Sequence, residues 1–340
     1  MIIASSPVYI FGPCSAESRE QVIRTAGELT AACCQLSVSF IFRAGVWKPR
    51  TRPNTFQGAG EEGLTWLQEV KERYGLPVAT EVATSEHIEA AMQAGMDYVW
   101  IGARTSANPI AVQMIADTLS RLSRKPKAVL VKNPVNADAA LWLGNMERIE
   151  KTGIPVMAIH RGCDHQPCWH VAHTIRTARP DIPMLLDPSH MSGEAKRVKG
   201  LWSKIAELGL DGAMIEVHCD PENALSDAKQ QVKPSVIRHQ LSEMRLQAEH
   251  SELHAIELNW LRAEIDELDE TLWQTIADRM EVSRRIGEWK KAHNVSPLQP
   301  DRYREIVERL HTKGENLGLS PEFMHAIWDL IHEESLKQQK

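Results

Sequence analysis

The feature that most constrains the fold is an eightfold alternation of short apolar runs with longer amphipathic stretches, which continues to about residue 237. The apolar runs are rich in β-branched residues and predict strands at Val8–Gly12, Ser39–Arg43, Pro77–Glu81, Tyr98–Gly102, Ala128–Lys132, Pro155–His160, Pro183–Asp187 and Ala213–His218. The amphipathic stretches predict helices at Arg19–Gln35, Glu61–Arg73, Ser85–Ala94, Pro109–Leu122, Ala137–Lys151, Trp169–Ala178, Glu194–Leu208 and Pro234–Gln247. Eight βα units favour a (β/α)8 TIM barrel. An open doubly wound sheet gives the same alternation, but the chain has no Gly-x-Gly-x-x-Gly turn to support it.

The pattern changes after Pro234, and apolar residues then recur at helical spacing from Glu257 to Ala292. A helix of this length would extend for about 54 Å. Shorter helices are predicted at Asp301–Lys313 and from Pro321 to the carboxyl end. A small all-helical domain with one very long helix cannot cover its apolar face alone, so we expect it to form a homodimer. The expected domains are residues 1–247 and 257–340, joined by a polar linker at 248–256.

Composition excludes several classes of protein. The 39 Lys and Arg against 45 Asp and Glu give a net charge of −6, which argues against a nucleic-acid partner. No apolar run approaches the roughly 20 residues of a membrane helix, and the start of the chain lacks the pattern of a signal peptide. Six cysteines in 340 residues do not make a disulfide scaffold, so we expect a cytoplasmic protein.

Polar and charged residues stand at the end of each predicted strand, where a barrel of this kind collects its chemistry. They are Cys14, Arg43, Glu81, Arg104, Lys132, His160, Arg161, Asp187, His190, Glu216 and His218. Four of them are cations in a net acidic chain, which indicates an anionic substrate. The run Lys48-Pro49-Arg50-Thr51 adds two cations and a hydroxyl, which suggests several anionic groups, such as two phosphates and a carboxylate.

A second group combines one thiol, one imidazole and two carboxylates: Cys14, His190, Glu216 and Asp227. This mixture suits a divalent transition metal better than Mg²⁺ or Ca²⁺, and it leaves Mn, Fe, Co and Zn open. Each residue also has a structural explanation. Cys14 could be a small buried side chain, and Asp227 could cap a helix that begins at Ala228.

Five motifs resemble those of 3-deoxy-D-arabino-heptulosonate 7-phosphate (DAHP) synthase. They are Gly12-Pro13-Cys14-Ser15, Phe42-Arg43-x₄-Lys48-Pro49-Arg50-Thr51, Ile101-Gly102-Ala103-Arg104-Thr105, Asp187-Pro188-Ser189-His190 and Ala224-Leu225-Ser226-Asp227. The resemblance implies that a metal ion is bound by Cys14, His190, Glu216 and Asp227. It implies that phosphoenolpyruvate is bound by Arg43, Lys48, Arg104, Lys132 and Arg161. The phosphate of erythrose 4-phosphate would lie near Arg50 and Thr51. Among these residues, Lys48, Lys132 and His190 are the expected catalytic groups.

The implied reaction is a metal-dependent condensation of phosphoenolpyruvate with erythrose 4-phosphate, the entry step of the shikimate pathway. The closest alternative is the related octulosonate 8-phosphate synthase, which uses arabinose 5-phosphate. The loop Lys48-Pro49-Arg50-Thr51 favours the four-carbon sugar, whereas Arg52 and Asn54 stand where many relatives carry Ser and Tyr.

The helical part carries cations of its own. Arg279 and Lys290 are separated by three helical turns and share a face about 16 Å apart, close enough to hold a small dianion between them. Arg262 lies about 100° around the same helix, so it would join that site only from a partner subunit. Ser335 and Gln339, four residues apart, form one polar face on the last helix.

This part resembles the all-helical chorismate mutases. The matching stretches are Leu261-Arg262-x₃-Asp266-x₂-Asp269, Ala277-x-Arg279, Gly287-x₂-Lys290, Pro300-Asp301-Arg302 and Glu334-Ser335-x₃-Gln339. The resemblance implies that Arg262 of a partner, Arg279 and Arg302 bind the anionic groups of chorismate, that Lys290 and Gln339 bind its ether oxygen, and that Ser335 lies in the pocket. Gln299 and Tyr303 replace the usual Asp and Glu, which supports a catalytically inactive ligand sensor as an alternative. A plain dimerisation module is a second alternative, but Arg279, Lys290 and Gln339 argue against it. Feedback inhibition of the barrel through this domain is a further expectation.

Overall fold

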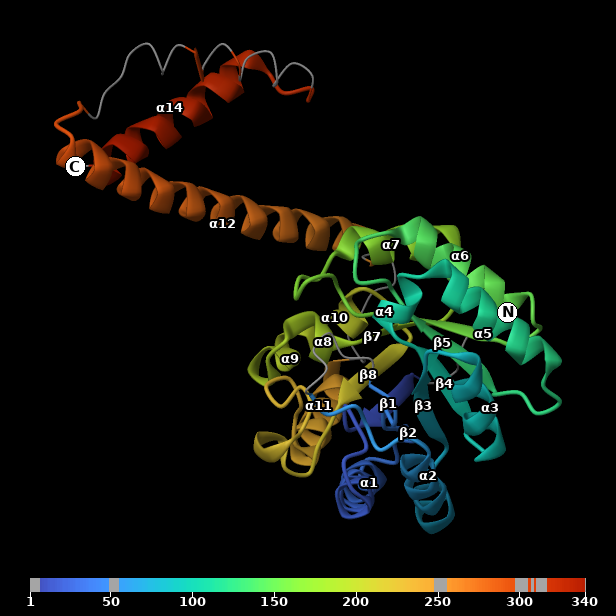
Figure 1. Ribbon diagram of the computed structural model, residues 1–340. Coiled ribbons are helices and arrows are strands. Elements are labelled where there is room, and N and C mark those ends of the chain that lie inside the picture. The colour runs from blue at the N-terminus through green and yellow to red at the C-terminus, as the bar shows by residue number, and fades with distance from the viewer. Residues whose placement is uncertain are drawn as a thin grey trace. The chain divides into compact units, whose positions relative to one another are not determined.

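The computed structural model describes residues 7–48, 55–247, 256–296, 305–306, 309 and 317–339. Its first part is a closed barrel of parallel strands in which β8 pairs with β1, as Figure 1 shows. The strands are β1 Val8–Gly12, β2 Ile41–Arg43, β3 Val78–Val82, β4 Tyr98–Ile101, β5 Ala128–Lys132, β6 Val156–His160, β7 Met184–Leu186 and β8 Gly212–Glu216. The predicted TIM barrel is therefore confirmed, with strand bounds that differ by at most two residues.

Helices follow the strands and surround the barrel. They are α1 Arg19–Cys34, α2 Glu61–Tyr74, α3 Ser85–Gln93, α4 Ala103–Ser106, α5 Pro109–Arg121, α6 Ala139–Glu150, α7 Trp169–Ala178, α8 Pro188–Ser192, α9 Ala195–Trp202, α10 Lys204–Glu207 and α11 Pro234–Gln247, with a 3₁₀ turn, η1, at Pro221–Asn223. The sequence did not predict α4 and α8, which are too short for a periodic pattern. It also predicted one helix where Ser203 separates α9 from α10.

The inside of the barrel is filled by one apolar side chain from each strand. This inner layer consists of Ile10, Ile41, Ala79, Trp100, Leu130, Ile159, Leu185 and Met214. Side chains of a strand alternate between two faces, so the residue two positions further on points into the barrel again. These next positions are Gly12, Arg43, Glu81, Gly102, Lys132, Arg161, Asp187 and Glu216. Six of these eight residues are charged, so the apolar layer lies directly beneath a mostly charged layer at the carboxyl ends of the strands.

Two compact units divide the chain, Met1–Glu264 and Ile265–Lys340. The division lies within α12, Ile256–Ala292, because the first turns of this helix pack on the barrel. Trp260 is 1% exposed and meets the Trp169 ring of α7 edge-on at 6.0 Å. His173, also on α7, stacks on Trp260 at 5.5 Å and contacts Glu264 through its Nδ1 at 2.6 Å.

The second unit contains the rest of α12 together with α14, Pro321–Gln338. The predicted helix Asp301–Lys313 and most of the predicted linker lie outside the described residues. Within unit 2, the backbones of α12 and α14 approach closely at Gly287, where an added Cβ would lie 2.6 Å from Gln339 Cα. Among the described helices, none is both long enough and apolar enough to cross a membrane.

Candidate active sites

A cavity of about 270 Å³ opens at the carboxyl ends of the barrel strands. Its lining consists of Arg43, Lys48, Glu81, Gly102, Ala103, Arg104, Lys132, Val135, Arg161, His165, His190, Asp227 and Gln230. All five cations that the sequence assigns to phosphoenolpyruvate are among these residues. The structure therefore brings together side chains that are up to 118 positions apart in the sequence, from Arg43 to Arg161.

Arg43 forms the floor of the cavity, where it is 1% exposed. Its guanidinium lies 4.6 Å above the ring of Trp100 in the inner layer. Nη2 donates to the carbonyl of Cys14 at 3.3 Å and to Glu216 Oε1 at 3.2 Å. Nε and Nη1 are buried and have no hydrogen-bond partner among the described residues. Because an unsatisfied buried donor is costly, these two groups are suited to an anionic ligand.

On the wall, buried Lys48 pairs with half-buried Glu81, with Nζ 3.7 Å from Oε2. Burial opposes the charge of Lys48, but the nearby carboxylates of Glu81 and Glu216 help to raise its pKa above the ordinary value. Gly102 makes space for this arrangement, since an added Cβ there would lie 2.1 Å from Glu81 Oε1. The sequence placed Glu81 at a strand end but gave it no role in the site.

Asp187 organises two further predicted residues. Its carboxylate accepts a bond from Lys132 Nζ at 2.6 Å and lies 2.8 Å from Nδ1 of His190. Burial opposes ionisation of Asp187, yet His190 and Lys132 hold its pKa well below the usual range. With Nδ1 engaged, His190 presents Nε2 to Glu216, 3.6 Å from Oε1. A carboxylate behind an imidazole in this way fixes the ring for metal binding.

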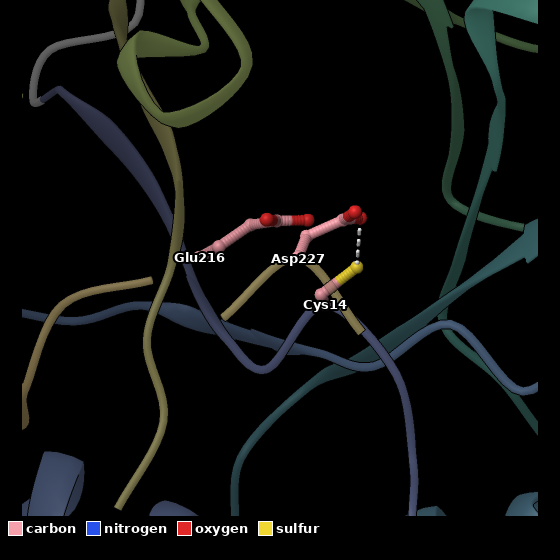
Figure 2. A group of neighbouring side chains, drawn as sticks. All are labelled: Cys14, Glu216 and Asp227. Carbon is pink, nitrogen blue, oxygen red and sulfur yellow. Dashed lines mark hydrogen bonds between the residues drawn. The ribbon is translucent and has the colours of Figure 1, made fainter. Parts of the chain in front are cut away.

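Cys14, Glu216 and Asp227 form a compact group of ligand-type side chains, shown in Figure 2. One ligand atom of each lies within 4.8 Å of the others, and Cys14 Sγ donates to Asp227 Oδ2 at 2.9 Å. They come from the loops after β1 and β8 and from the end of β8 itself. Asp227 adopts the left-handed conformation with φ 47°. The structure therefore brings three of the four predicted ligands together, and His190 Nε2 lies 3.6 Å from the carboxylate of Glu216.

The protonation of this group fits a cation. Burial, followed by the Glu216 carboxylate, raises the pKa of the Cys14 thiol. The thiol therefore retains its proton and donates a hydrogen bond to Asp227. A divalent ion on the same atoms would replace that proton, as expected when a thiol binds metal. Thiolate, imidazole and carboxylate together match the preferences of first-row transition metals.

Two glutamines that the sequence analysis missed hold the ligands in place. Gln230 Nε2 donates to Glu216 Oε2 at 2.7 Å. Gln231 Oε1 accepts from the backbone N–H of Cys14 at 2.9 Å, and its Nε2 donates to the Ser226 carbonyl at 2.8 Å. Both side chains are buried. Their position three and four residues after Asp227 is the one sequence signal that could have identified them.

The remaining predicted residues of the barrel differ in their surroundings. Arg161 is half-buried, and its backbone N–H donates to Asn133 Oδ1 at 2.7 Å, whereas Arg104 is exposed at the rim of the cavity. His165, another cavity residue that the sequence did not predict, lies in the loop after β6. Arg50 and Thr51 lie outside the described residues.

The second unit gathers a separate polar site between α12 and α14. Arg279 donates to the hydroxyl of Ser335, and Lys290 Nζ donates to Gln339 Oε1 at 3.0 Å. The Arg279 guanidinium also lies 5.1 Å above the ring of Trp328. Four predicted residues of the helical domain are thus found as two cross-helix pairs. Arg262 is exposed in unit 1, and Arg302 lies outside the described residues.

Comparisons with known proteins assign a family to each part of the chain. Residues 4–251 match the DAHP synthetase I family, and residues 261–340 match chorismate mutase type II. The chain is 32% identical over 243 residues to phospho-2-dehydro-3-deoxyheptonate aldolase of Thermotoga maritima, which covers 69% of this chain and 68% of that protein. It is 29% identical over 248 residues to 2-dehydro-3-deoxyphosphooctonate aldolase of Geobacter sulfurreducens, with 66% of this chain and 86% of that protein covered.

Solved structures give the same assignment for the barrel. The crystal structure of the Thermotoga maritima DAHP synthase matches with a TM-score of 0.62 at 29% identity, over 72% of this chain and 70% of that one. A truncated form of the same enzyme matches with a TM-score of 0.60 at 27% identity, over 72% of this chain and 88% of that one. The chain therefore belongs to the DAHP synthetase I family and carries a chorismate mutase type II domain at its carboxyl end.

Proposed function

We propose that the barrel condenses phosphoenolpyruvate with erythrose 4-phosphate to give DAHP and inorganic phosphate. The observation that carries this proposal is the cavity that five cations line together with His190 and Asp227, two of the expected metal ligands. In the reaction, C3 of phosphoenolpyruvate forms a bond to the aldehyde carbon, water adds at C2, and phosphate leaves. Two anions must approach one another, so cationic positioning supplies much of the catalysis.

The chain's own residues divide this work. The two unpartnered donors of buried Arg43 can form a fork to one anionic group of phosphoenolpyruvate. Lys132, Arg104 and Arg161 line the same cavity and supply further charge for its phosphate and carboxylate. Lys48, which its neighbours keep charged, can stabilise negative charge that develops during the attack.

Cys14, His190, Glu216 and Asp227 would hold a divalent transition metal. When bound, such an ion acts as a Lewis acid on the sugar aldehyde. Asp187 would keep the His190 ring directed at the ion through Nδ1, and Gln230 would fix the free oxygen of Glu216. The affinity of the site for Mn, Fe, Co and Zn, and the availability of these metals in the cell, determine which one is bound.

The choice of erythrose 4-phosphate rests on the sequence Lys48-Pro49-Arg50-Thr51 and on the Thermotoga relative. The octonate aldolases among the relatives make arabinose 5-phosphate the alternative acceptor. The test is the rate of phosphoenolpyruvate loss with each sugar phosphate, with and without a chelator. We expect turnover with erythrose 4-phosphate that the chelator removes and that an added metal restores. A faster reaction with arabinose 5-phosphate would assign the barrel to the alternative.

For the helical domain we propose the rearrangement of chorismate to prephenate. This reaction needs no nucleophile. It needs a pocket that binds the compact conformer and stabilises charge on the breaking ether bond. Lys290 and Gln339, 3.0 Å apart, can both donate to the ether oxygen, while Arg279 beside Ser335 can bind a carboxylate. Loss of chorismate absorbance at 274 nm tests the activity, and prephenate binding without turnover would indicate a sensor instead.

We further propose a cytoplasmic homodimer formed through α12. Six apolar side chains of this helix, at spacings of three or four residues, support the dimer: Leu258, Leu261, Ile265, Leu268, Leu272 and Ile276. The first five of them are at least 47% exposed in a single chain. None of the six cysteines, all of which the structure describes, forms a disulfide, in keeping with a reducing compartment. Sedimentation equilibrium of the full chain should give twice the mass of 38.3 kDa.

Feedback is the remaining part of the proposal. A ligand of the mutase domain would lower the synthase rate if it binds two states of the protein with different affinity, and a coupling of about 1–3 kcal/mol is sufficient. The test adds prephenate to the full-length synthase assay at concentrations that saturate the helical site. An unchanged rate would show that the fusion serves another purpose.

A further inference from the structure

One face of α14 carries a polar residue whose role is not yet assigned. Trp328, His332, Ser335 and Gln339 follow at steps of four, three and four residues, so they line a single face of the helix. The two cations of α12 contact this face on both sides of His332. Arg279 reaches Trp328 and Ser335, and Lys290 reaches Gln339.

His332 itself is half-buried, and its ring lies 6.3 Å from that of Trp328 at an angle of 25°. Arg279 contacts the residue one turn before His332 and the residue one turn after it, so the imidazole lies within the segment that Arg279 spans. The Nε1 of Trp328 is buried without a hydrogen-bond partner among the described residues. A buried donor of this kind beside the Arg279 guanidinium indicates a surface that is completed by a polar ligand.

We propose that His332 is a further substrate-binding residue of the mutase pocket and that it forms a hydrogen bond with the ring hydroxyl of chorismate. This inference rests on the proposed mutase function of the helical domain. Chorismate offers two carboxylates and an ether oxygen, which accept hydrogen bonds and suit the cations and amide already described. Its fourth polar group is a neutral hydroxyl, which both donates and accepts.

A neutral imidazole matches that hydroxyl because it also has one donor and one acceptor. Burial, together with the positive charges of Arg279 and Lys290, lowers the pKa of His332, while Asp329 opposes the shift. The ring is therefore uncharged near neutral pH. It adds specificity to the pocket without adding a third positive charge to those of Arg279 and Lys290.

The test compares two substitutions with two substrates in the full-length protein. His332→Leu removes the hydrogen bond at similar volume, and His332→Gln retains a donor and an acceptor. The substrates are chorismate and an analogue that lacks only the ring hydroxyl. We expect His332→Leu to lower kcat/KM for chorismate about tenfold, the size expected for one hydrogen bond, with most of the rate restored in His332→Gln. With the analogue, both variants should match the unsubstituted protein.

The matched control is His325→Leu, a change on the same helix at a residue that is 61% exposed and pairs with Asp329. It should leave both rates unchanged. An equal loss with chorismate and the analogue would mean that His332 only supports the fold, and no loss at all would also overturn the inference. If the unsubstituted protein does not rearrange chorismate, the proposed mutase function itself is wrong, which is a different result. Thermal unfolding of each variant identifies any that are misfolded. If His332→Leu is misfolded, the kcat/KM values of His332→Gln with chorismate and with the analogue are compared instead.

Discussion

Glu216 is the residue at which the buried contacts of the barrel site meet. One oxygen accepts from Arg43 at 3.2 Å and lies 3.6 Å from His190 Nε2, while the other accepts from Gln230 at 2.7 Å. Burial opposes its charge, but His190, Arg43 and Lys48 lower the pKa of Glu216 to about 2. The carboxylate is therefore ionised over the whole physiological pH range and stands ready to bind a cation.

Gln230→Leu should weaken metal binding without breaking the fold. The substitution removes the donor that holds Glu216 Oε2, and loss of a partner behind a metal ligand typically reduces affinity about 10- to 100-fold. Isothermal titration with Mn²⁺ measures the change directly. Gln113→Leu, at an exposed glutamine of α5 that bonds to Asp117, is the control and should leave the affinity unchanged. Equal affinities in the two variants would show that Glu216 is held by other contacts.

Cys14→Ala should abolish the condensation and spare the rearrangement of chorismate. The thiol lies among the ligand atoms of the barrel, whereas none of the residues proposed for the mutase reaction belongs to that cluster. Removing one of four ligands should bring phosphoenolpyruvate loss to the background rate, and the 274 nm assay serves as the internal control. Full condensation by a metal-stripped Cys14→Ala protein would contradict the metal site.

At the scale of elements, the close approach of β1 and β2 sets the position of Arg43. Gly12 has φ +148°, and an added Cβ would lie 2.0 Å from the carbonyl oxygen of Arg43. Gly12→Ala should therefore lower the free energy of unfolding by at least about 2 kcal/mol and raise KM for phosphoenolpyruvate. Gly200→Ala is the control, since nothing lies within 4 Å of its added Cβ on helix α9. That change should stabilise the protein by about 0.5–1 kcal/mol.

His160, at the end of β6, should make the free energy of unfolding depend on pH. Burial lowers the pKa of His160 to about 4, although its ring bonds to the Pro167 carbonyl at 2.7 Å. The unfolded chain binds a proton below a pH of about 6.5, while the folded chain stays neutral there, so His160 should remove about 3 kcal/mol of stability as the pH falls from 6.5 to 4. Denaturant titrations should show a shallower loss for His160→Gln than for the unsubstituted protein. His239→Gln, at a 63% exposed side chain, should leave the slope unchanged.

Strand alternation explains how much of the site could be predicted. Arg43, Lys132 and Glu216 each lie two residues after a buried apolar side chain, and that spacing alone directs them into the mouth of the barrel. Gln230 and His165 lie in loops, where no period determines the direction of a side chain. Their roles follow from contacts with residues distant in the sequence. The short helices α4 and α8 were missed for the same reason, since each is held by its place at a strand end.

At the scale of the whole molecule, the proposed dimer makes a prediction about how its mutase pockets are assembled. Arg262 is exposed and lies about 100° around α12 from Arg279, so we expect it to complete the pocket of the neighbouring subunit. Arg262→Ala and Lys290→Ala proteins should each lose the rearrangement. After mixing and subunit exchange, heterodimers with one intact pocket should recover part of the activity. No recovery after demonstrated exchange would mean that each pocket is built within one chain.

The two-residue step from the apolar floor to the charged layer has a consequence for engineering. Codons that determine whether the barrel folds and codons that position phosphoenolpyruvate are interleaved in the same eight strands, so random mutation of these strands damages both properties together. None of the strands predicted from the sequence includes the segment from Pro49 to Asn54. A gene library restricted to those six codons would vary recognition of the sugar phosphate while the catalytic floor stays constant. Families of aldolases that differ in the length of the acceptor sugar could diverge by the same route.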